Sequence, residues 1–236
     1  MKSTVLIANL RKHQADFHPV VPFFAEKDNL IQIDFTEKNK ELNDGILSDT
    51  GKFTDYINRE LQKNQARYGI GGYGELRNVY NRSKVFDAVK DGEEPRRLHL
   101  GTDIWGKPHT PVMAPLDGIV HSFAFNNNFG DYGTTIILTH LLDGLSFFTL
   151  FGHLALNSIK NMEAGDRIEK GDVLAEFGIP VENGHWPPHL HFQLIMDLQG
   201  WEGDYPGVCK YSEKEKWLTN CPDPDIVLKL DQYIMK

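Results

Sequence analysis

The pattern of apolar and polar positions changes character near residue 95. Before that point, Phe53, Ile57 and Leu61 recur at helical spacing within GKFTDYINRELQKNQARY, which predicts an amphipathic helix. The glycine-rich stretch GIGGYGE follows and predicts a turn that stops this helix. We therefore expect residues 1–94 to form a helical flank. This flank is a candidate lid over a functional site.

Beyond residue 95, the apolar runs become short and typical of strands. They are VMAPLDGIVHSF, TTIILTH, LSFFTLF, DVLAEF and HLHFQLIM, and turns rich in Gly, Asn and Asp separate them. Such runs predict a mainly β, compact antiparallel domain. Residues 198–236 are turn-rich and aromatic and end in DIVLKLDQYIM, which predicts a C-terminal extension packed on the core and a short final helix.

Composition limits the partners and the location. A formal net charge of −8 over 236 residues argues against nucleic acid or an anionic membrane surface as partner. No apolar stretch is long enough to span a bilayer, and the first residues lack the features of a signal peptide. We expect a cytoplasmic protein, or an extracytoplasmic one if the chain is a processed form. The oligomeric state stays open.

The two cysteines, Cys209 and Cys221, both lie in the C-terminal segment. Their spacing matches no zinc-binding pair. We expect reduced, partly buried thiols, and a local disulfide or metal ligation remains the alternative.

Histidines supply the candidate chemistry. On a strand, residues two apart point to one face, so His189 and His191 in HLHFQL share a face while Leu190 and Phe192 enter the core. Taken alone, this pattern is more often a pair of surface histidines than a metal site. It gains weight from other histidine motifs in the same chain.

Two further motifs lie upstream. His99 and Asp103 in HLGTD can meet one ion if the chain turns sharply at Gly101, and His153 in FGHL closes the strand run LSFFTLF. Alone, His153 also fits a core histidine with satisfied hydrogen bonds. Together the motifs supply three metal ligands and two spare imidazoles, which is the inventory of a catalytic zinc site rather than a structural one. They point to hydrolysis.

The order of these motifs resembles the lysostaphin-type, or LytM-like, zinc metalloendopeptidases, which cut peptidoglycan peptide bridges. The resemblance covers residues 95–197 and includes the sequences that connect the motifs, namely APLDGIV, GDYGTTIILTH and AGDRIEKGDVLAEFG. It implies an antiparallel β-sandwich or barrel-like domain. It also implies that His99, Asp103 and His191 bind zinc, and that His153 and His189 are catalytic histidines beside the metal.

The implied site makes chemical sense for a zinc metallopeptidase that hydrolyses peptide bonds through a metal-activated water. Zinc lowers the pKa of water from about 15.7 to near 7. His189 would then take the proton and pass it to the leaving nitrogen, while His153 would stabilise the oxyanion or share the proton transfer. Because the chain lacks HExxH, a histidine must replace the glutamate base.

Departures from the family pattern leave other functions open. VENGHWPP replaces the usual small-residue run, and Gln193 stands where glutamate is commoner. The sequence from ENG through WPPHLHFQ to GDYPGV is similar to a variant of this peptidase domain. That variant is found in fusion proteins, between a phosphotransferase-like kinase domain and a class III aminotransferase domain. That likeness implies an intracellular amidohydrolase acting on a small peptide or amino-acid derivative. Independently of that likeness, His185 lies four residues before His189 and is a candidate to line the cleft, and Asn183 or Trp186 is a candidate substrate contact.

Two other classes remain. Biotinyl or lipoyl carrier domains contain sequences similar to APLDGIV and GDRIEKGDVLAEFG. A carrier domain needs a modifiable lysine in an exposed hairpin, and here the hairpin offers only Lys170, in the wrong place. A metal-free regulatory or binding relative of the peptidase fold is the last alternative. The sequence leaves the scissile bond and the true substrate open.

Overall fold

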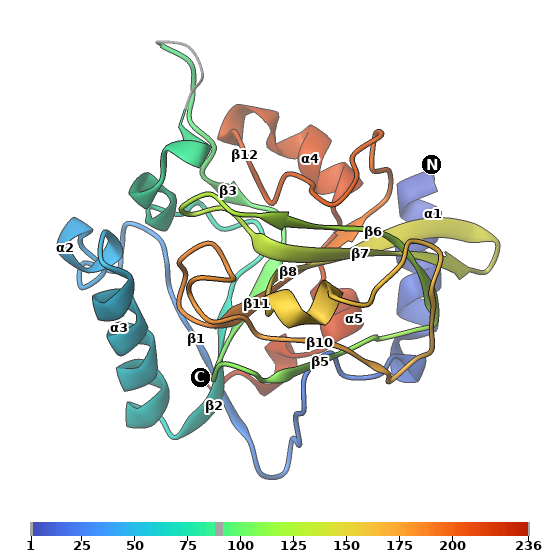
Figure 1. The fold of residues 1–236 in the computed structure, drawn as a ribbon, viewed down its shortest axis with the longest axis horizontal. Helices are drawn as coiled ribbons and strands as arrows, with labels where there is room; N and C mark the ends of the chain where they lie inside the picture. The colour runs from blue at the N-terminus through green and yellow to red at the C-terminus, as the bar shows by residue number, and fades with distance from the viewer. Residues whose placement is uncertain (1, 88–91, 236) are drawn as a thin grey trace.

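The computed structural model describes residues 2–87 and 92–235, and its centre is one eight-stranded sheet (Figure 1). The strands follow the order β1-β2-β4-β11-β8-β7-β6-β9. Their bounds are Asn29–Gln32 (β1), Ala66–Gly71 (β2), Thr102–Trp105 (β4), His189–Ile195 (β11), Leu145–Leu154 (β8), Gly133–Leu142 (β7), Gly118–Asn126 (β6) and Arg167–Ile168 (β9). Only β1 and β2 pair in parallel, and the other pairs of this sheet are antiparallel.

Two small antiparallel sheets complete the β structure. One joins β5 (Pro111–Met113) to β10 (Val173–Glu176), and the other joins β3 (Leu98–His99) to β12 (Val208–Cys209). The predicted strand runs after residue 95 all contain a strand. The mainly β class is therefore confirmed.

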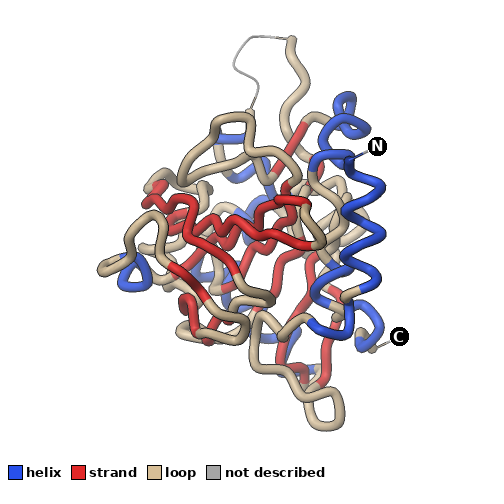
Figure 2. Tube along the Cα trace, turned by 90° about the vertical axis from the view of Figure 1, so that its right-hand side faces the viewer, coloured by secondary structure: helices blue, strands red, loops and turns tan. Residues whose placement is uncertain are grey.

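Helices lie on the outside of the sheet. The α-helices are Lys2–Lys12 (α1), Asp44–Leu47 (α2), Thr50–Lys63 (α3), Lys214–Asn220 (α4) and Asp225–Leu228 (α5). Short 3-10 helices span Gln14–Asp16, Val79–Arg82, Lys84–Phe86, Leu156–Ile159, Tyr211–Glu213 and Asp231–Tyr233. Figure 2 shows α1 running along one side of the strands. Among the described residues, no helix is both long and apolar enough to cross a bilayer.

Helix α3 confirms the predicted amphipathic helix, since Phe53, Ile57 and Leu61 are all buried on it. The stretch predicted as its stop is different. Helix α3 ends at Lys63, and Gly69 lies inside strand β2. A Cβ on Gly69 would overlap the Ile33 side chain, so this glycine serves close packing within a strand rather than a turn.

The N-terminal flank contains strands in addition to the expected helical structure. Its strands β1 and β2 extend the main sheet beside β4, which belongs to the strand-rich half. The final helix is also shorter than predicted, because Lys229 adopts a left-handed backbone with φ 54° directly after α5. The boundaries proposed for the three segments stay predictions.

Both faces of the sheet are covered. On β11, Leu190, Phe192 and Leu194 enter the core that α1 and α5 cover, whereas Ile195 enters the core that contains Cys209 and Cys221. Because side chains alternate along a strand, His189, His191 and Gln193 lie on the same face as Ile195. The candidate site therefore lies on the face that the first part of the C-terminal extension, residues 198–221, covers.

Candidate metal centre

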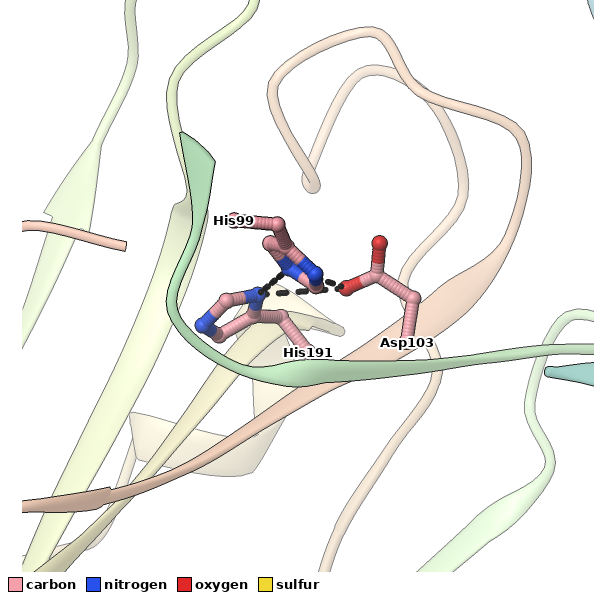
Figure 3. Close-up of side chains that lie close together, drawn as sticks. All are labelled: His99, Asp103 and His191. Carbon is pink, nitrogen blue, oxygen red and sulfur yellow. Dashed lines mark hydrogen bonds and ion pairs between the residues drawn. The ribbon is translucent and has the colours of Figure 1, made fainter. Parts of the chain in front are cut away.

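Three predicted ligand residues come together in a buried cluster. The His99 Nε2 atom lies 3.0 Å from His191 Nδ1 and 3.3 Å from Asp103 Oδ1, and His191 Nδ1 lies 3.1 Å from that same oxygen. All three side chains are buried. Figure 3 shows their polar ends turned toward one another.

Strand pairing produces this convergence. His191 on β11 stands directly opposite Asp103 on β4, and β12 pairs with β3 so that Val208 stands opposite His99. The chain bends at Gly101 between the two motif residues. A Cβ there would lie 2.5 Å from the His191 ring, so only glycine leaves room for the imidazole.

Hydrogen bonds behind the cluster fix which nitrogen atoms face it. His99 Nδ1 lies 2.9 Å from the carbonyl oxygen of Gly72, and His191 Nε2 lies 2.9 Å from the side-chain oxygen of Gln193. Both partners are acceptors, so these nitrogens can carry the ring protons. In those tautomers, the lone pairs of His99 Nε2 and His191 Nδ1 face each other and Asp103, as metal binding requires.

This arrangement of lone pairs fits a divalent cation. Three acceptors 3.0–3.3 Å apart repel one another unless a positive charge lies between them. Ligands about 2.0–2.1 Å from a tetrahedral zinc ion lie about 3.3 Å apart. Two imidazoles and one carboxylate are also a ligand set typical of zinc. The donor set and its spacing thus suit Zn²⁺.

Arg77 supports the cluster from the N-terminal flank. Its guanidinium, 1% exposed, donates to Asp103 Oδ2 at 2.6 Å and to Glu75 Oε2 at 2.7 Å. Burial alone raises the pKa of Asp103, but the His99 imidazole and Arg77 outweigh it and hold that pKa well below its usual range. Burial and Arg77 together lower the pKa of His99 to about 4.

His153 and His189 lie beside the cluster in a stacked pair. Their ring centroids are 4.1 Å apart, and His189 also stacks on Trp105 at 3.8 Å. The His153 Nδ1 atom lies 2.8 Å from the Asn183 carbonyl oxygen, and His189 Nδ1 lies 2.8 Å from that of Pro187. Each Nδ1 is thus protonated, and each Nε2 has no hydrogen-bond partner among the residues that the structure describes.

Burial keeps this pair neutral. It lowers the pKa of His189 to about 4. Burial, and secondly the repulsion that a protonated His189 would exert, lower the pKa of His153 well below its usual value. His153 also adopts a left-handed backbone with φ 63°, which is strained for a residue with a Cβ. Strain of this kind concentrates at functional positions.

The segment before His189 holds both catalytic candidates in place. Asn183 is fully buried, and its side chain donates to the Gly178 and Trp186 carbonyl oxygens and accepts from the Trp186 amide. Its role is therefore to clamp the loop rather than to contact substrate. From the flank, Arg82 donates to the His185 carbonyl oxygen at 3.1 Å and packs 4.5 Å from the Trp186 ring.

A cleft of about 190 Å³ joins the two groups of site residues. Asp103, His153, His189 and His191 line it, together with Trp186. Its other walls come from the flank and the C-terminal extension, through Tyr80, Val85, Phe86, Trp201, Tyr205 and Pro206. Residues from all three segments of the chain thus shape the space beside the metal cluster.

The remaining histidines lie outside this cleft. His109 is exposed, whereas His140 is buried in β7, where it contacts the Asp117 carbonyl oxygen at 2.8 Å and the Thr149 hydroxyl at 2.7 Å. Burial lowers the pKa of His140 to about 4. The thiols of Cys209 and Cys221 are free, and they are fully buried rather than partly buried as expected.

The structure thus brings His99, Asp103 and His191 together and places His153 and His189 at the same cleft. Their division into ligands and catalysts stays a prediction. Sequence reasoning missed Arg77, since a single arginine in ELRNVY gives no periodic or motif signal. Gln193 departs from a family pattern in the sequence, but no sequence signal indicates its contact with His191.

Comparisons with known proteins agree with the motif order. Residues 97–202 match the model of peptidase family M23. An uncharacterized metalloprotease from Haemophilus influenzae is 29% identical over 156 residues, which are 64% of this chain and 29% of that protein. The L-Ala–D-Glu endopeptidase of Bacillus subtilis is 31% identical over 107 residues, which are 43% of this chain and 31% of that protein.

Among solved structures, the catalytic domain of the antimicrobial peptidase lysostaphin from Staphylococcus simulans is 22% identical, with a TM-score of 0.41. That alignment covers 75% of this chain and 97% of the lysostaphin chain. The chain spans less than a third of the length of the two curated relatives. The segment that carries the site, residues 97–202, is thus similar to peptidase family M23.

Proposed function

We propose that the protein is a zinc-dependent metallopeptidase that hydrolyses peptide bonds. The observation that carries this proposal is the convergence of three metal-ligand atoms, from His99, Asp103 and His191, beside His153 and His189. Within residues 2–87 and 92–235, neither of these two histidines has a hydrogen-bond partner at Nε2. Zinc held by the three residues would supply Lewis acidity, which lowers the pKa of water and polarises a carbonyl. The M23 match over residues 97–202 supports the same reaction class.

The two catalytic candidates are suited to proton transfer. Their protonated Nδ1 atoms are held by backbone carbonyls, so each ring offers Nε2 as a proton acceptor. Because the rings stack with centroids 4.1 Å apart, the first proton disfavours a second, and the pair titrates as a unit. We assign proton transfer from water to the leaving nitrogen to His189. His153 would share this proton transfer, since its Nε2 is also a proton acceptor.

A short peptide is the proposed substrate. The cleft of about 190 Å³ is small, and both the flank and the C-terminal extension build its walls. A confined cleft favours a few residues over a cross-linked polymer. Because a relative is named as an L-Ala–D-Glu endopeptidase, soluble peptidoglycan peptides are included. The cytoplasmic location and the likeness to the fused variant stay predictions from the sequence.

A peptide screen with controlled metal content tests the proposal. The purified protein is stripped with a chelator, reloaded with zinc, and incubated with glycine-rich peptides, peptidoglycan peptides and amino-acid amides. We expect cleavage of at least one peptide by the zinc-loaded protein and none by the stripped protein or by His191→Ala. Equal cleavage with and without zinc, or no cleavage of any peptide, would contradict the proposal.

A further inference from the structure

Gln193 lies directly behind one ligand of the proposed metal site. It follows His191 by two residues on β11, so both side chains lie on the same face of the sheet. Its side chain is fully buried, and its Oε1 atom lies 2.9 Å from His191 Nε2. The hydroxyl of Tyr132 lies farther from that nitrogen, at 3.3 Å.

The C-terminal extension orients the Gln193 amide. The Nε2 atom donates to the carbonyl oxygen of Pro206 and to the sulfur of Cys221, both at 3.2 Å. An amide with its nitrogen turned toward these acceptors must turn its oxygen toward His191. An oxygen at that position accepts only, so it favours the neutral imidazole with its proton on Nε2, in competition with Asp103 Oδ1, which lies 3.1 Å from Nδ1.

We infer that Gln193 is a positioning residue that sets the tautomer of His191 and so presents its Nδ1 lone pair to the metal. The inference rests on the proposed function, in which His191 is a ligand. Partners of this kind orient a ligating histidine and change metal affinity by about 10- to 100-fold. Through Pro206 and Cys221, the C-terminal extension takes part in that positioning.

The surroundings of Gln193 separate tautomer control from plain packing. Methionine fills a similar volume but accepts no strong hydrogen bond, so Gln193→Met releases the proton of His191 to either nitrogen. In Gln193→Glu, the side chain still presents an oxygen that accepts from His191 Nε2. The glutamate variant therefore keeps the tautomer that the methionine variant loses.

Histidine 15N spectra of the metal-free protein read this tautomer directly, above the usual imidazole pKa of about 6.5. We expect the Nε2-protonated form of His191 in the wild-type protein and in Gln193→Glu. In Gln193→Met we expect a mixture or the Nδ1-protonated form. An unchanged His191 tautomer in Gln193→Met, or the same loss in both variants, would overturn the inference.

Zinc affinity by chelator competition gives the second readout. We expect Gln193→Met to weaken zinc binding by about 10- to 100-fold, Gln193→Glu to stay within about threefold of wild type, and the exposed control Gln62→Met to match wild type. Equal losses in both Gln193 variants would show a structural role only and contradict tautomer control. Failure of wild-type protein to bind zinc would refute the proposed function, whereas the metal-free spectra would still decide the role of Gln193.

Discussion

Replacement of Arg77 by methionine tests whether the N-terminal flank is part of the metal centre. Arg77 comes from the flank, yet its guanidinium donates to Asp103 Oδ2 at 2.6 Å and to Glu75 Oε2 at 2.7 Å. The variant keeps much of the aliphatic stem and removes the charge. It leaves Asp103 and Glu75, both largely buried, without their cation.

The size of the effect follows from the distance. At an effective dielectric constant of about 20, unit charges 2.6 Å apart attract by about 6 kcal/mol. Desolvation of both groups offsets part of this attraction, and removal of one partner from a buried pair costs about 3–5 kcal/mol. We therefore expect Arg77→Met to lower the free energy of unfolding of the metal-free protein by about 3–5 kcal/mol.

Urea unfolding of the metal-free protein provides the measurement. A double-mutant cycle with Asp103→Asn isolates the coupling energy between Arg77 and Asp103. We expect this coupling energy to be about 2 kcal/mol or more. Arg67→Met is the matched control, since the Arg67–Asp28 pair is partly exposed and is worth about 1 kcal/mol or less. The reasoning is refuted if Arg77→Met costs no more than Arg67→Met, or if the coupling energy is near zero.

Three further predictions follow from the site and its surroundings. His153→Ala and His189→Ala should each retain zinc while activity falls about 100-fold or more; loss of zinc in both would make them ligands instead. The stability of the metal-free protein should fall as pH drops from about 6.5 to 4, because protons bind the unfolded state first. With its pKa lowered to about 4, His140 accounts for about 3 kcal/mol of that loss. His140→Leu should flatten the pH dependence of urea unfolding by this amount, and an unchanged slope would contradict the assignment. Gly101→Ala should weaken zinc binding about tenfold or more, because its Cβ would lie 2.5 Å from the His191 ring; wild-type affinity by chelator competition would exclude this crowding.

The sequence predicts the parts of the site that local periodicity controls. Alternation along β11 places His189 and His191 on one face and sends Leu190 and Phe192 into the core. Motif spacing with a glycine bend allows His99 and Asp103 to meet. These features depend on residues close together in the chain, and they are visible without tertiary structure.

Features that depend on distant packing were not predictable. Arg77 reaches Asp103 only because β2 pairs with β4, a contact between segments that no local pattern connects. The sequence predicts Gly69 as part of a helix stop, whereas in the structure the Ile33 side chain occupies the space that a Cβ of residue 69 would need. Likewise, Asn183 reads as a candidate substrate contact, and its burial as a loop clamp appears only in the folded chain.

Anomalous diffraction at the zinc absorption edge tests the central claim most directly. The account predicts one zinc ion per chain, bound at about 2.0–2.2 Å by His99 Nε2, Asp103 Oδ1 and His191 Nδ1, with His153 and His189 beyond bonding distance. An ion bound by His153 or His189, or zinc-loaded crystals with no anomalous peak in the cluster, would contradict it.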